Sequence, residues 1–160
     1  MCGIIGYVGK ADATPILLEG LRRLEYRGYD SSGLAVMNGN SDAPIQTRKR
    51  SGRLDNLRKL LKENPADGNC GISHTRWATH GEPTDENAHP HHDRSGKLAL
   101  VHNGVIENYQ VLKDQLEEDG HTFHSQTDSE VLAHLVGNAY EVSEEGIRSA
   151  DLSRRFAKPC

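Results

Sequence analysis

The chain begins Met1-Cys-Gly-Ile-Ile-Gly-Tyr-Val8, which places a cysteine at the second position of an apolar stretch. Removal of the initiator methionine would leave Cys2 with both a thiol and a free α-amine. A free α-amine has a pKa of about 7.7–8.0 in model peptides, so part of it is neutral near pH 7 and can accept the thiol proton. N-terminal threonine nucleophiles are activated in the same way. The alternative is that Cys2 is a small buried apolar residue at the start of a strand.

The residues that follow Cys2 predict a strand and then a helix. Residues 3–8 are β-branched and punctuated by glycine, which is typical of a short buried strand. The next helix can be capped by Asp12 or Thr14, and leucines recur along it at helical spacing. Gly28 is expected to end this helix.

The middle of the chain predicts more strands around a second helix. Strands over 33–37 and 45–50 are expected to pair as a hairpin, and a leucine-rich helix is expected to end at Asn64-Pro65. Strands are also expected over 70–74 and 97–102. Each of these last two leads into a polar loop, and loops in that position often build functional sites.

The last third of the chain favours helices. One is predicted from about 107 to 119, and another begins at Thr127-Asp-Ser-Glu130, which has the spacing of a capping box. Beyond Tyr140 the pattern weakens, and residues 141–160 show no clear periodicity.

Length and charge narrow the classes of protein. A chain of 160 residues can form one domain with a real core. The net charge of −4 gives no electrostatic reason to expect a nucleic-acid or membrane partner. A basic cluster at Arg48-Lys-Arg50 could bind phosphate, but such clusters are usually solvated faces. Three cysteines without close spacing predict a reducing, cytoplasmic location.

Nine histidines invite a metal interpretation, above all the run His89-Pro-His-His92. Structural zinc sites pair their ligands across short gaps, however, and no two cysteines here are paired that way. We therefore expect histidines that line a site or support the structure, and no metal.

The polar residues also fit an acyl-transfer site, which needs a nucleophile, a base and donors for an oxyanion. Cys2 offers the first two, and the Asn103 side chain with the Gly104 backbone N–H offers two donors. An amino-acid head group would need a guanidinium and a carboxylate, which Arg76 and Asp128 could supply. Taken separately, these residues could equally be a surface ion pair, a helix-start residue and an ordinary turn.

Six stretches together resemble the glutaminase half of the glutamine:fructose-6-phosphate amidotransferases. They are Met1-Cys-Gly-Ile-Ile-Gly6, Leu21-Arg-Arg-Leu-Glu-Tyr-Arg-Gly-Tyr-Asp-Ser-Ser-Gly33, His74-Thr-Arg-Trp-Ala-Thr-His-Gly81, Asn87-Ala-His-Pro-His91, Val101-His-Asn-Gly-Val-Ile-Glu-Asn108 and Thr127-Asp-Ser-Glu130. The resemblance implies an α+β fold of the N-terminal-nucleophile hydrolase type, a four-layer α/β/β/α sandwich with antiparallel sheets. It also implies a reaction, in which glutamine is hydrolysed to glutamate and ammonia without a metal or organic cofactor.

The resemblance implies a role for each matched residue. Cys2 corresponds to the nucleophile, and Asn103 and Gly104 correspond to the oxyanion hole. Arg76 and Asp128 correspond to the residues that hold the carboxylate and the amine of glutamine. Three further residues belong to the same binding segment: Trp77, Thr79 and His80. Arg27 corresponds to a support near the nucleophile, and Trp77 also to a gate for ammonia.

The resemblance covers only part of such an enzyme. We expect a partial glutaminase domain over 1–140, a poorly matching tail over 141–160 and no sugar-isomerase domain, so that the chain is truncated. Fructose 6-phosphate would then be reached only through downstream domains that are absent here, and we expect a homo-oligomer. Two alternatives stay open: another amidotransferase of the same fold, and a non-catalytic fragment that binds glutamine or a partner protein.

Overall fold

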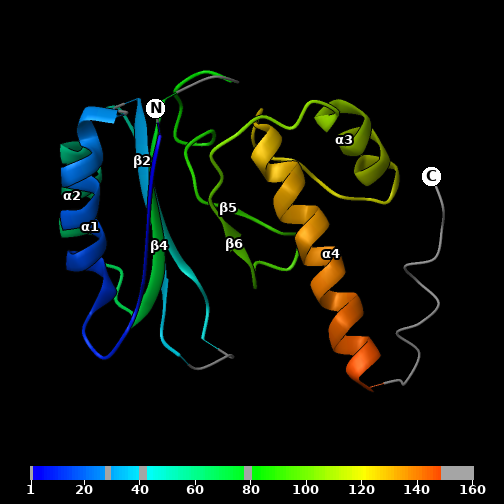
Figure 1. Cartoon of the computed structure of the whole chain (residues 1–160), viewed down its shortest axis with the longest axis horizontal. Coiled ribbons are helices and arrows are strands. Elements are labelled where there is room, and N and C mark those ends of the chain that lie inside the picture. Colours follow the sequence, from blue (N-terminus) through cyan, green and yellow to red (C-terminus); the bar gives the residue numbers. More distant parts are fainter. Residues whose placement is uncertain (1, 28–29, 40–42, 78–80, 149–160) are drawn as a thin grey trace.

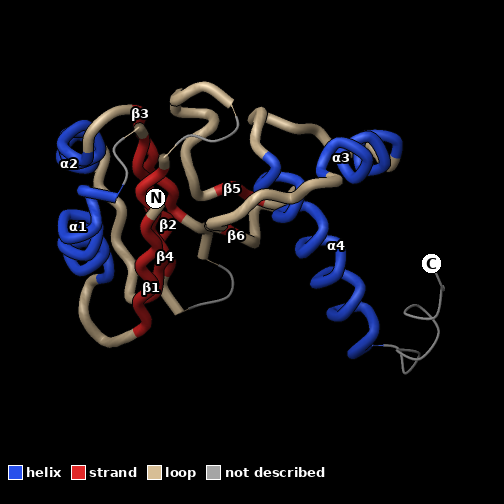
Figure 2. Tube along the Cα trace, turned by 45° about the horizontal axis from the view of Figure 1, so that its top comes forward, coloured by secondary structure: helices blue, strands red, loops and turns tan. Residues whose placement is uncertain are grey.

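The computed structural model describes residues 2–27, 30–39, 43–77 and 81–148, which form four layers (Figure 1). Helices α1 (Ala13–Leu24) and α2 (Leu54–Glu63) cover one face of a four-stranded sheet. A two-stranded sheet lies beyond the other face, and α3 (Tyr109–Glu118) and α4 (Asp128–Arg148) form the last layer. Figure 2 shows the same succession of helices, strands, strands and helices from a second direction. The expected four-layer α+β fold is confirmed.

The main sheet is antiparallel throughout and has the order β1-β4-β2-β3. Its strands are β1 (Gly3–Val8), β2 (Ser31–Met37), β3 (Gln46–Ser51) and β4 (Cys70–Arg76). Gly3 lies opposite Thr75, so the residue before β1 is brought to the end of β4. This register places Cys2 beside the polar loop that follows β4.

Helices α1 and α2 form because their leucines pack on this sheet. The core cluster contains Leu17, Leu21, Leu34, Leu54 and Leu57, each at most 2% exposed. The Asp12 side chain caps α1 by accepting the Thr14 N–H at 3.1 Å. The predicted strand, helix and hairpin elements of this half are all present, although α1 ends at Leu24 in a short 3-10 turn (Glu25–Arg27) and Gly28 lies outside the described residues.

The second sheet differs from the prediction. The strand expected over 97–102 is present only as β6 (Ala99–Leu100), which pairs with β5 (His91–His92), a strand that was not predicted. Pro90, directly before β5, has no N–H to extend the pairing. Beyond β6, the His102 N–H donates to the Nδ1 atom of His89 at 3.3 Å.

Helix α4 begins at Asp128 and continues beyond Tyr140, where no periodicity had been recognised, to Arg148. The hydrogen bonds of Glu130 differ from those of the predicted capping box. Glu130 accepts the backbone N–H groups of His124 and Ser125 at 2.8 and 2.6 Å, so it binds the loop before the helix. None of the helices in the described part of the chain is long and apolar enough to span a membrane.

Candidate active site

Cys2 lies where the start of β1 meets the end of β4. The Trp77 backbone N–H donates to the Cys2 Sγ atom at 3.1 Å, and the Trp77 carbonyl oxygen lies 3.6 Å from the same sulfur. Because Gly3 pairs with Thr75, the antiparallel register carries Cys2 directly to this segment. An N–H group that points at sulfur can donate to negative charge that forms there, so this contact suits a sulfur nucleophile.

The loop after β6 brings Asn103 to the same place. Its Nδ2 atom lies 3.5 Å from the Cys2 carbonyl oxygen, across 101 positions of sequence. Its Oδ1 atom lies 2.8 Å from the His74 Nε2 atom. At the next position, a Cβ atom on Gly104 would come 2.7 Å from the His102 ring, so any larger residue there would require that ring to shift. The predicted proximity of Cys2 and the Asn103-Gly104 loop is therefore found.

Arg76 is the last residue of β4 and is 5% exposed. Its guanidinium donates to the carbonyl oxygens of Glu82 and Gly81 at 3.2 and 3.3 Å. Burial lowers the pKa of Arg76, and the nearby charges of Cys2, Asp30 and Asp128 oppose this change. An arginine stays protonated through such shifts, so the site contains a permanent, buried positive charge.

Asp128 is the first residue of α4 and is also 5% exposed. Its Oδ2 atom accepts the Ile106 N–H at 2.8 Å, which ties the start of the helix to the loop that contains Asn103. The helix N-terminus favours a carboxylate at this position. Arg76 and Asp128 thus supply opposite charges near each other, and the charges of Cys2 and Asp128 both act on the Arg76 guanidinium.

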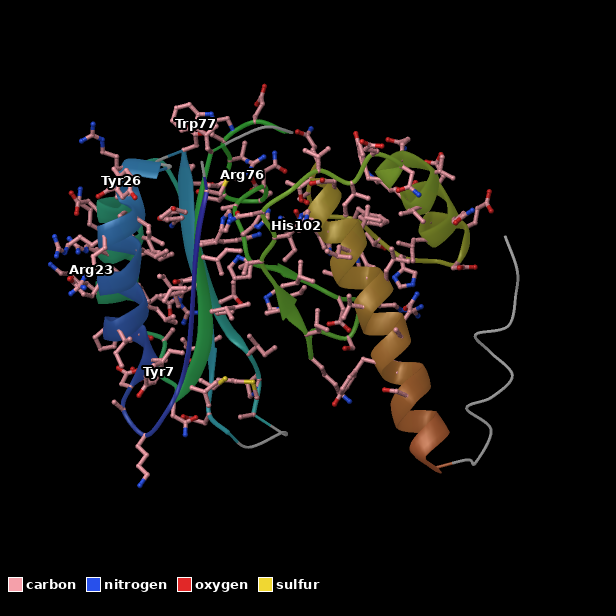
Figure 3. The ribbon with its side chains drawn as sticks, in the orientation of Figure 1. Tyr7, Arg23, Tyr26, Arg76, Trp77 and His102 are labelled. Carbon is pink, nitrogen blue, oxygen red and sulfur yellow. The ribbon has the colours of Figure 1, made fainter. Side chains whose placement is uncertain are left out.

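The structure gives less detail for the other predicted site residues. Figure 3 shows Arg76 between the main sheet and the start of α4, on the side of His102, with Trp77 at the end of the sheet. The Trp77 side chain is 46% exposed. Arg27 ends the 3-10 turn after α1, and nothing is described of its side chain; Thr79 and His80 lie outside the described residues.

The sequence predicts histidines that line a site or support the structure but assigns no individual role to the three that pack together next to this site. The rings of His74 and His89 stack with centroids 4.4 Å apart, and His91 meets His89 edge-on at 4.6 Å. One signal was available: His74 and Arg76 alternate on β4, so they share a face of the sheet. Among the described residues, no group of three or more histidine, cysteine or acidic side chains is arranged to hold a metal ion.

These histidines predict acid sensitivity. Burial is the largest cause of a lowered pKa in each, to about 4 for His74 and about 2 for His91. The unfolded chain binds protons near pH 6.5 and the folded chain does not, so stability is complete above pH 6.5 and falls as the pH drops towards 4 and below. We expect the protonation of His74 alone to lower the free energy of unfolding by about 3 kcal/mol across that range. Urea unfolding at pH 7, 5.5 and 4.5 should show the decline; an unchanged free energy would contradict it.

Comparison of the sequence with known proteins identifies similar proteins. A family profile described as "Glutamine amidotransferase domain" matches residues 61–146. Curated relatives from Clostridium tetani, Thermus thermophilus and Mycobacterium tuberculosis are 55%, 56% and 54% identical over 141, 140 and 147 residues. All three are named glutamine–fructose-6-phosphate aminotransferase (isomerizing). The alignments cover 88–90% of this chain but only 23% of each relative.

Solved structures show the same fold. A glutamine phosphoribosylpyrophosphate amidotransferase from B. subtilis, complexed with ADP and GMP, superposes with a TM-score of 0.71 at 31% identity. A structure described as the allosteric regulatory enzyme of purine biosynthesis superposes with a TM-score of 0.72 at 32% identity. Each match covers 86% of this chain and 29% of the other chain. The chain therefore belongs to the glutamine amidotransferase domain family and has its N-terminal-nucleophile hydrolase fold.

Proposed function

We propose that this chain hydrolyses glutamine to glutamate and ammonia through Cys2. The observation that carries the proposal is the position of Cys2, whose sulfur lies 3.1 Å from the Trp77 N–H and whose carbonyl oxygen lies 3.5 Å from the Asn103 amide nitrogen. The thiol proton passes to the Cys2 α-amine as sulfur attacks the side-chain amide carbon of glutamine. The C–S bond forms, the C–N bond breaks, and the amine returns the proton to the departing nitrogen, which leaves as ammonia. Water then cleaves the γ-glutamyl thioester to give glutamate and the free thiol.

The surrounding charges support glutamine as the substrate. The buried Arg76 guanidinium can bind the α-carboxylate, and the Asp128 carboxylate can bind the α-ammonium. Asn103 and the Gly104 N–H would stabilise the oxyanion of the tetrahedral intermediate. Trp77, Thr79 and His80 would complete the binding segment, and Arg27 would support the nucleophile. The chemistry uses protein groups and water, and no cofactor enters it.

The names of the relatives suggest where the ammonia goes. We propose that, where this domain is joined to the rest of such an enzyme, the ammonia aminates fructose 6-phosphate to glucosamine 6-phosphate. In this proposal Trp77, half-exposed at the end of the sheet beside Cys2, would gate its passage. In this proposal residues 1–140 are part of the glutaminase domain, and the sugar is bound by downstream domains.

A glutamate-release assay, combined with the mass of the intact chain, tests the glutaminase proposal. Chain that has lost Met1 should release glutamate and ammonia in equal amounts, whereas chain that retains Met1 should release neither because its α-amine is blocked. Two results would contradict the proposal: release from the Met1-bearing chain, or no release from a folded chain that begins at Cys2. The second result would favour a binding domain instead.

Asp128→Asn should weaken glutamine binding. The variant keeps an oxygen that can accept the Ile106 N–H but loses the charge that would pair with the substrate ammonium. Losing one charge of a buried pair should raise the KM by about 30-fold or more, and kcat should change much less. Asp114→Asn, at an exposed position of α3, is the matched control. An unchanged KM in Asp128→Asn would exclude the head-group role.

Two further proposals concern the state of the chain. The described cysteines, Cys2 and Cys70, are both free, which supports a reducing, cytoplasmic compartment and can be checked by cell fractionation.

Strand β1 is an edge of the main sheet, carries no charged side chain and exposes 81% of Val8. Such an edge favours pairing with another chain, so we expect self-association in sedimentation; a strict monomer would contradict it.

A further inference from the structure

The Asn103 amide can be placed in two ways, and only one of them helps catalysis. With its NH₂ group towards Cys2 it donates to the oxyanion, whereas a flipped amide would present an oxygen to the same negative charge. Asparagine itself has no preference between the two, because its oxygen and nitrogen ends are similar in size. A neighbouring group must therefore select the orientation.

His74 is placed to make that selection. Its side chain is 1% exposed, and its Nε2 atom lies 2.8 Å from Asn103 Oδ1. Since an amide oxygen only accepts, the His74 Nε2 atom must carry the hydrogen. The His74 Nδ1 atom is then bare, and it is buried without a hydrogen-bond partner. A neutral ring whose single hydrogen is on Nε2, directed at Asn103, accounts for the environment of both nitrogens.

The ring of His74 is itself held by the histidine packing below it. His89 stacks on it at 4.4 Å, and His89 Nδ1 accepts the backbone N–H of His102, the residue before Asn103. Gly33 lies opposite His74 in the sheet, and a Cβ atom there would collide with the His89 carbonyl oxygen. The same packing thus fixes both the side-chain partner of Asn103 and the backbone that leads to it.

We infer that His74 is a positioning residue, which donates its Nε2–H to Asn103 Oδ1 and so turns the Asn103 NH₂ group towards the oxyanion formed at Cys2. The inference rests on the proposed hydrolysis of glutamine. His74 touches neither the thiol nor the substrate amide in this scheme. Its effect is confined to the transition state, because the ground-state amide of glutamine carries no negative charge.

Two substitutions of His74 separate the hydrogen bond from packing. His74→Leu removes the donor and should lower kcat by about 10–100-fold with KM within about 2-fold, less than removal of the oxyanion donor itself. His74→Gln carries an amide N–H at a similar reach and should recover most of the lost kcat. His134→Leu is the control, because His134 is equally buried, at 3% exposed, but its ring contacts are with His121 and Phe123. It should leave kcat unchanged per folded chain.

A double variant and an inhibitor test the route through Asn103. If His74 acts only by orienting Asn103, His74→Leu should cost nothing further in an Asn103→Ala background. The aldehyde analogue of glutamine adds to the Cys2 thiol and places an oxyanion-like oxygen in the hole. Its affinity should fall in His74→Leu by the same factor as kcat, while glutamine binding to the Cys2→Ala chain should not change when His74→Leu is added.

The outcomes distinguish the two proposals. If wild-type chain that begins at Cys2 neither releases glutamate nor binds the aldehyde, the proposed function fails. If the wild type is active, any of three results overturns the role of His74. The first is an unchanged kcat in His74→Leu, and the second is a rise in KM in place of the fall in kcat. The third is a double variant whose fall in kcat equals the product of the falls in His74→Leu and Asn103→Ala. Loss in His74→Gln equal to that in His74→Leu would also overturn it, since packing alone would then explain both.

Discussion

Cys2→Ala is expected to abolish glutamate release, with a loss on the order of 10⁶-fold, the scale seen when a covalent nucleophile is removed. The variant retains the α-amine, the Asn103 donor and the Arg76 charge but has no atom that can form the thioester. The residual rate should then be what the remaining donor and binding charge supply, about 10³–10⁴-fold over the uncatalysed reaction. The fold should persist, because Cys2 precedes β1 and contributes nothing to the leucine core.

Covalent labelling provides the measurement for this prediction. A glutamine-like electrophile should modify Cys2 alone, because only Cys2 combines a neighbouring amine with oxyanion donors. Cys70→Ala is the matched control, since Cys70 is a free thiol on β4 with no place in the site, and it should retain full activity and labelling. Equal labelling of the Cys2→Ala chain, or modification of Cys70, would show that another thiol is the nucleophile.

Asn103→Ala should have the second-largest effect, a decrease in kcat of about 10²–10³-fold with little change in KM. The side chain donates only to charge that develops during the reaction, so the affinity of the ground state is not affected. Steady-state kinetics on glutamate release give both constants.

Asn56→Ala is the control for Asn103→Ala. The Asn56 side chain donates to the Ser51 carbonyl oxygen, on the far side of the molecule from α4. This variant should leave both constants unchanged. A rise in KM without a fall in kcat for Asn103→Ala would indicate that Asn103 binds substrate instead of stabilising the oxyanion.

Local patterns were sufficient for the first half of the fold. The β-branched opening, the leucine spacing and the turn residues predicted β1, α1, the β2–β3 hairpin and α2, because each pattern reflects burial of one face of a local element. The same patterns failed for β5, a strand of two residues that is too short to show a periodicity. They also failed for the last turns of α4, where Tyr140 remains 50% exposed and no apolar face repeats.

The sequence by itself determined which chemical groups the site contains and where local structure ends beside them. Short-range periodicity and capping predicted that Cys2 precedes a strand and that Asp128 lies at the start of a helix. They ended the strand before Arg76 at residue 74, whereas the structure makes Arg76 the last residue of β4. Only the tertiary structure decided that Asn103 meets Cys2 across 101 positions of sequence and that His74 holds its amide. Contacts of this kind depend on sheet register and on the packing of one layer against another. Neither is encoded in a local pattern, because both arise only when distant elements bury their apolar faces together.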